Sequence, residues 1–135
     1  MTGKHRRHGV NLQVITAPDG TLVWISPAAA GRVHDLTAAR RHRITATCVR
    51  PGIPVLAGKA CQGAGAIAAA PRRRKPGKDL TPEQKSASRA HSRLRWPAGR
   101  AIARIKTWRI LRKARPSPTK LTSIARAILT PETHR

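Results

Sequence analysis

Acidic side chains are scarce in this sequence of 135 residues, which holds five Asp and Glu against 28 Lys and Arg. The five are Asp19, Asp35, Asp79, Glu83 and Glu132. Chemistry that needs several carboxylates together, as metal ligands or as general bases, has few residues to use. The formal charge of +23 predicts a polyanionic partner, because Lys and Arg that neutralise phosphates release condensed counterions.

Large apolar side chains are also scarce. Phe and Tyr are absent, Ala occurs 22 times, and Val, Ile and Leu together number 25. Alanine buries little apolar area, and burial stabilises by roughly 25 cal/mol per Å². With this charge, the composition lies near that of disordered chains. We therefore expect marginal stability, or dependence on DNA or a partner.

Clustered metal ligands and membrane segments are lacking too. Cys48 and Cys61 form no Cys-x-x-Cys pair, so we expect two free thiols in a reducing compartment. Residues 5–8, His-Arg-Arg-His, are typical of a solvated basic arm, and no metal site is predicted. No apolar run approaches the roughly 18 to 20 residues of a membrane helix, and no signal peptide pattern is present. These absences favour a cytoplasmic chain without a membrane partner.

The first half of the sequence predicts strands. Residues 9–28 form an expected β-hairpin, with turn chemistry at Pro18-Asp19-Gly20. Asp35 could cap a helix that runs to about Arg43. Residues 53–57 are a short apolar run between glycines, which favours a buried strand parallel to its neighbour.

Residues 62–80 have the composition of a flexible basic loop. Its run Arg72-Arg73-Arg74-Lys75 is either a solvated charge patch or a phosphate-contacting loop.

Helices dominate the second half. Thr81-Pro82-Glu83-Gln84 has the pattern of a capping box and predicts a helix to about Arg95, where Trp96-Pro97 should interrupt it. A second helix is expected from Ala98 to about Lys113, with basic residues that either contact a nucleic-acid backbone or are simply solvated. A last helix should cover residues 120–129. This order of elements predicts the α/β class.

Three blocks of sequence resemble the C-terminal half of bacterial insertion-sequence transposases of the DDE superfamily endonuclease type. They are residues 3–11 (Gly-Lys-His-Arg-Arg-His-Gly-Val-Asn), residues 26–36 with Ser-Pro and Gly-x-x-His-Asp, and residues 106–111 (Lys-Thr-Trp-Arg-Ile-Leu). The resemblance implies one partial catalytic domain over residues 1–135, built as a partial RNase H-like core. That core would hold a β-hairpin, a helix, one further strand and C-terminal helices, and would lack the first strand.

The resemblance also implies an active site of three carboxylates that hold two divalent ions, Mg or Mn. The first Asp would lie upstream of Met1. Gly58 stands at the position of the second Asp, and Gly99 at that of the Glu. His34 and Asp35 fall at accessory positions near the site, although Asp35 can equally be a helix cap.

We therefore expect a truncated, catalytically inactive relative of these transposases that needs no cofactor of its own and retains non-specific, electrostatic DNA binding. The candidate DNA contacts are Lys4, Arg6, Arg7, Lys106, Arg109, Arg112 and Lys113. Association with other transposase chains is a further expectation. Two other hypotheses remain: a standalone basic nucleic-acid-binding protein, and an enzyme completed in trans, which Gly58 and Gly99 argue against.

Overall fold

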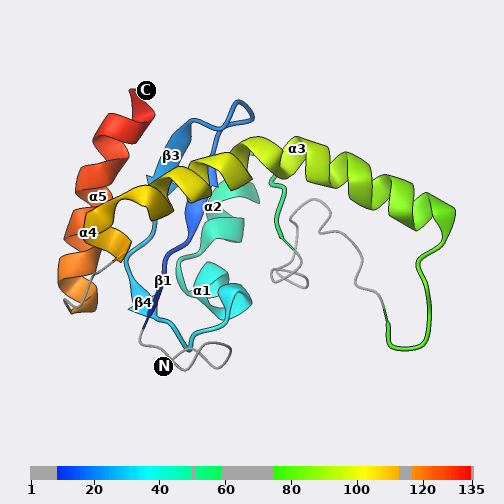
Figure 1. Ribbon diagram of the computed structural model, residues 1–135, viewed down its shortest axis with the longest axis horizontal. Coiled ribbons are helices and arrows are strands. Elements are labelled where there is room, and N and C mark those ends of the chain that lie inside the picture. The colour runs from blue at the N-terminus through cyan, green and yellow to red at the C-terminus, as the bar shows by residue number, and fades with distance from the viewer. Residues whose placement is uncertain (1–8, 50, 59–74, 113–116, 135) are drawn as a thin grey trace.

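The structure is a computed structural model that describes residues 9–49, 51–58, 75–112 and 117–134. It is a mixed α/β fold, as predicted (Figure 1). The strands are β1 (Val10–Asn11), β2 (Val14–Thr16), β3 (Leu22–Ile25) and β4 (Ala29–Ala30). The helices are α1 (Asp35–Arg41), α2 (Ile44–Val49), α3 (Pro82–Thr107), α4 (Arg109–Arg112) and α5 (Pro118–Thr133).

The predicted hairpin is confirmed. β2 and β3 pair antiparallel, with Val14 opposite Ile25, and β1 pairs with β4 in a second antiparallel ladder. The turn forms because Gly20 adopts φ 92°, a conformation that glycine tolerates. Asp19 stabilises it, since its carboxylate accepts hydrogen bonds from the backbone N–H and the hydroxyl of Thr21, at 2.7 and 2.9 Å.

The predicted helix after the hairpin is present as α1, but Asp35 does not cap it. The N-cap residue is His34, which makes no side-chain capping bond. The Asp35 carboxylate instead accepts a hydrogen bond of 2.7 Å from the Asn11 side chain. The side chain of Asp35 therefore binds Asn11, a residue far from it in sequence, and this hydrogen bond links α1 to β1.

The strand predicted over residues 53–57 is wrong. These residues are irregular, and the two sheets of the described chain have two strands each, all antiparallel. Pro54 has no N–H to donate to a ladder, and Ile53 is 56% exposed, so the apolar run is not buried as a central strand requires. Helix α2, which was not predicted, ends just before it.

Helix α3 begins as predicted and ends later than predicted. The Thr81 hydroxyl accepts from the Gln84 N–H and the Gln84 side chain accepts from the Thr81 N–H, so the capping box is confirmed. The interruption at Trp96-Pro97 is wrong, because α3 continues to Thr107. Gly20 packs against this point: a Cβ there would lie 2.9 Å from the Pro97 carbonyl oxygen. Tertiary packing thus supports a helix that Pro97 weakens by removing one hydrogen bond.

The rest of the second half also differs in its boundaries. Trp108 separates α3 from the short α4, where one helix was expected over residues 98–113. The last helix is longer than expected and runs through Pro131. Its end is attached to the hairpin, since the Thr133 hydroxyl donates to the Leu22 carbonyl oxygen at 2.9 Å.

The core lies between the hairpin, the C-terminal half of α3, and α5. Leu22, Ile25, Ile105 and Ala125 form its buried cluster. The N-terminal half of α3 projects away from this body (Figure 1), and Leu94 on it is 66% exposed. In the described residues, alanine makes up nearly half of the buried apolar positions: Ala29, Ala38, Ala39, Ala101 and Ala125.

The expected flexible basic loop at residues 62–80 falls mostly outside the described residues. Its described part, residues 75–80, contains a turn at Pro76 and Gly77 and no helix or strand.

Candidate functional site

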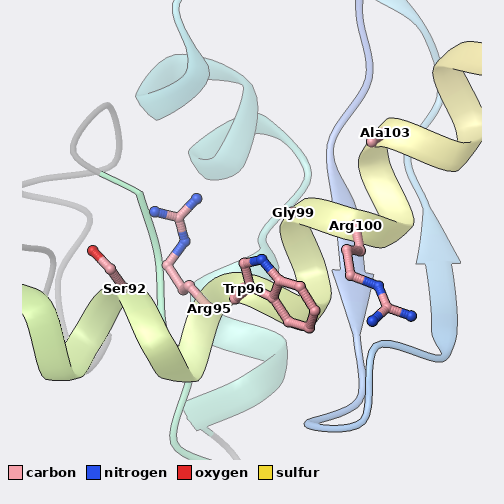
Figure 2. A pocket seen from close by; sticks show the side chains of 6 residues that line it. All are labelled: Ser92, Arg95, Trp96, Gly99, Arg100 and Ala103. Atoms are coloured by element: carbon pink, nitrogen blue, oxygen red, sulfur yellow. The ribbon is translucent and has the colours of Figure 1, made fainter.

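Gly58 lies beside the side chain of Arg95. Gly58 ends the irregular segment after α2, and a Cβ there would lie 3.6 Å from a guanidinium nitrogen of Arg95. Gly99 lies one helical turn after Arg95 on α3, so the two share a face (Figure 2). A Cβ at Gly99 would meet no described atom within 4 Å. Of the two positions at which the family resemblance implies carboxylates, Gly58 therefore borders a positive charge, whereas no described side chain comes within 4 Å of a Cβ at Gly99.

Asp35 is held elsewhere, on the hairpin. Asn11 donates to its Oδ1 at 2.7 Å and also to the Val33 carbonyl oxygen at 2.9 Å. Gln13 adds a longer bond of 3.4 Å to the same Oδ1. His34 is exposed beside it as the N-cap residue of α1. The first two sequence blocks thus meet through Asn11 and Asp35.

The third block is held by a buried carboxylate that sequence reasoning missed. Glu132, 3% exposed near the end of α5, accepts from the Trp108 indole N–H at 3.0 Å and from Arg104 Nε at 3.1 Å. Burial of a charge requires such partners. The Trp of the Lys-x-Trp-Arg block therefore joins the end of α3 to α5.

One face of α3 forms a basic stripe, which we define as Lys85, Arg89, Arg93, Trp96 and Arg100. All five residues are exposed. Arg100 stacks over the Trp96 ring, 4.6 Å from guanidinium carbon to ring centroid. Glu83 is the single acid of α3, against seven Lys and Arg. The four-residue spacing of Lys85, Arg89 and Arg93 is a sequence signal for the stripe. The helix predicted to end near Arg95 leaves out Trp96 and Arg100, which continue it.

A scan against protein-family models matches the DDE superfamily endonuclease family over residues 2–130. The chain belongs to this family. The match covers nearly all of the sequence and confirms the resemblance drawn from the three blocks. No curated protein and no solved structure matches the chain significantly.

The donor set of this DDE-family chain does not fit a pair of divalent ions. Among the described residues, no three His, Cys, Asp or Glu side chains cluster as metal ligands. Mg and Mn favour carboxylate oxygens, whereas Gly58 and Gly99 supply no side-chain oxygen and Arg95 adds a repelling charge beside Gly58. No step through a metal ion follows from these residues.

The DNA contacts expected from the sequence are only partly placed. Lys106, at the end of α3, and Arg109, at the start of α4, are exposed. The remaining candidates lie outside the described residues or have side chains outside the description: Lys4, Arg6, Arg7, Arg112 and Lys113. In the described part of the chain, no helix combines the length and apolar character needed to cross a membrane.

Proposed function

We propose that this member of the DDE endonuclease family binds DNA and does not cut it. The observation that carries the proposal is that Gly58 and Gly99 supply no side-chain oxygen and that the Arg95 guanidinium borders Gly58. Two-metal cleavage needs oxygen ligands that hold the ions about 3.5 to 4 Å apart. Glycine offers none, and no rotamer of a neighbour replaces both. The proposal depends on these two positions and not on where the chain begins.

Retained DNA binding is supported by charge. The chain carries +23, and seven cations of α3 stand against one acid. Exposed Lys and Arg contact phosphates in any sequence, so we propose non-specific binding, with Lys106 and Arg109 among the contacts. Part of an RNase H-like core remains the proposed fold, supported by an antiparallel hairpin followed by helices.

The nuclease part is tested with supercoiled plasmid in Mg or Mn, alongside an active DDE transposase as positive control. We expect no nicked product from the purified chain. If nicking does occur, gel filtration of the purified chain identifies its source, because the chain's own activity would elute with the chain whereas a contaminating nuclease of another size would not. Metal-dependent nicking that elutes with the chain would overturn the proposal.

The binding part is tested by titrating a short duplex at several salt concentrations. If 6–10 phosphates are contacted, affinity should fall by roughly 10³ to 10⁵ between about 50 and about 200 mM salt. A nearly flat salt dependence would remove DNA as a partner.

The second candidate function, a standalone basic nucleic-acid-binding protein, is favoured by the basic stripe on α3. This candidate function predicts tighter binding to RNA than to DNA of the same sequence. Association with other transposase chains is tested by co-purification with an intact family member; its absence would favour this second candidate.

A further inference from the structure

Trp96 contacts the Arg100 guanidinium, which stacks over its ring. It is 60% exposed on α3. The other two tryptophans of the sequence are half-buried: Trp108 donates its indole N–H to Glu132, and Trp24 packs edge-on to His42 with ring centroids 6.2 Å apart. A single exposed apolar side chain is common on protein surfaces, but this ring lies among cations, so the site offers a flat apolar face together with positive charge.

The surface beside Trp96 is a shallow groove of about 390 Å³ (Figure 2). Its lining residues are Ser92, Arg95, Trp96, Gly99, Arg100 and Ala103. Two guanidinium groups line it and no carboxylate does. The groove has free space at Gly99, since even a Cβ there would meet no described atom within 4 Å. The groove therefore combines an aromatic face, positive charge and free space.

We propose that this groove binds single-stranded DNA, with an unpaired base stacked on Trp96 and the phosphates beside it paired with the basic stripe. Arg100 already covers the ring from one side, so the base would stack from the other. Stacking on an aromatic ring accepts any base, whereas duplex DNA hides the base faces inside the helix. This inference rests on the proposed DNA binding and adds a preference for unpaired strands.

The basic stripe defines a path for the bound single strand along α3. From Lys85 to Arg100 the helix rises about 22 Å, at roughly 1.5 Å per residue. A second shallow groove of about 320 Å³, lined by Ser88, Arg89, Ser92 and Arg93, continues from the first along the same helix. Because Ser92 lines both, the strand can run along α3 from the Trp96 groove toward the N-terminal end of the helix.

The test compares a labelled oligo(dT) single strand with a duplex of equal length, using fluorescence anisotropy on the full chain. Trp96→Ala should weaken single-strand binding by about five- to 150-fold, the range for loss of one base stack, and should change duplex binding less than about twofold. Trp96→Phe should keep most of the single-strand affinity because it keeps an aromatic face. Leu94→Ala is the matched control: it truncates an apolar side chain that is 66% exposed on another side of α3 and should change neither affinity.

Tryptophan fluorescence provides a second readout. Oligo(dT) should quench the wild-type emission, and Trp96→Ala should lose most of the quenching, because the other two tryptophans are held in the fold. Equal losses on single strand and duplex, or no loss at all in Trp96→Ala, would overturn the inference while leaving the proposed DNA binding in place. If the wild-type chain bound neither oligonucleotide, the proposed function itself would fail. Tighter binding of oligo(rU) than of oligo(dT) would overturn the assignment to DNA.

Discussion

Arg95 decides what a carboxylate restored at Gly58 would do. Its guanidinium lies 3.6 Å from where a Cβ at Gly58 would be. An aspartate at this position would therefore form an ion pair with Arg95, in competition with a metal ion. An ion pair of this kind lowers the carboxylate's affinity for cations. If Gly58 stands at a carboxylate position of the family, as proposed, restoring that one acidic residue would therefore not be enough to restore a metal site.

Glu132 is the residue whose loss should most weaken the packing of α3 against α5. Glu132→Gln keeps the shape and an oxygen for the Trp108 indole, but it removes the charge that partners Arg104. We expect the free energy of unfolding to fall by about 1–2 kcal/mol, less than for a fully buried pair because the Arg104 side chain is 35% exposed. Urea denaturation measures the change. Glu83→Gln is the control. The Glu83 carboxylate is exposed and, among the described residues, interacts only with its own backbone N–H and with Thr81 at the start of α3, so this variant should lower the midpoint by less than Glu132→Gln. Equal midpoints for both variants would contradict this role of Glu132.

At the scale of elements, the hairpin turn packs closely against α3 where Gly20 lies next to Pro97. Gly20→Ala should destabilise the chain for two reasons, a positive φ of 92° and a Cβ 2.9 Å from the Pro97 carbonyl oxygen. Gly52→Ala is a matched control, since Gly52 also has a positive φ, 69°, but nothing lies within 4 Å of its Cβ position. The strain common to both costs about 1 kcal/mol, and we expect Gly20→Ala to lose about 2–3 kcal/mol in all. Thermal and urea unfolding of both variants measure the difference. Equal losses of stability in the two variants would show that the close contact between residue 20 and Pro97 adds no cost of its own.

The same turn should respond to acid. The backbone N–H of Thr21, and then its hydroxyl, hold the pKa of Asp19 below its ordinary value of 3.8. A carboxyl whose pKa is lowered on folding stabilises the fold above its ordinary pKa, and this contribution is lost as pH falls through the lower folded value. Asp19→Ala should therefore melt below the wild type near neutral pH, and the gap should shrink as pH falls below 3.8. Melting temperatures measured from about pH 6 to about pH 2 test this; a gap independent of pH would contradict it.

Local chemistry explains which elements the sequence predicts correctly. The capping box at Thr81 and the turn at Pro18-Asp19-Gly20 involve residues within a few positions of one another, and both form as expected. Residues 53–57 and Pro97 were misjudged because their state depends on distant partners. Among the described residues the first segment pairs with no strand, and the helix through Pro97 packs against Gly20.

At the scale of the whole molecule, the candidate site shows the same limit. The sequence alone identifies glycine at positions 58 and 99 through the family resemblance. It does not reveal that Arg95 adjoins Gly58, since the two residues lie far apart along the chain and no local pattern links them. The charge that first suggested DNA binding is also a cost to the fold, because like charges repel in the compact state.

This charge predicts two opposite effects of salt. The free chain carries a charge of +23, and alanine makes up nearly half of its described buried apolar positions. Added salt should therefore raise its melting temperature by screening repulsion, with a Debye length of about 10 Å at 0.1 M. For the chain with duplex DNA, the ligand adds about 2.7 kcal/mol at a hundredfold excess over Kd, and salt removes this increment by weakening binding. The melting curves with and without DNA should therefore converge as salt rises from about 50 to about 200 mM. Scanning calorimetry of both series at matched salt tests this, with an equal concentration of uncharged polymer in place of DNA as the control. A DNA-induced shift that persisted at high salt would show that contacts other than phosphate pairing dominate, because counterion release is the only contribution that salt removes so steeply.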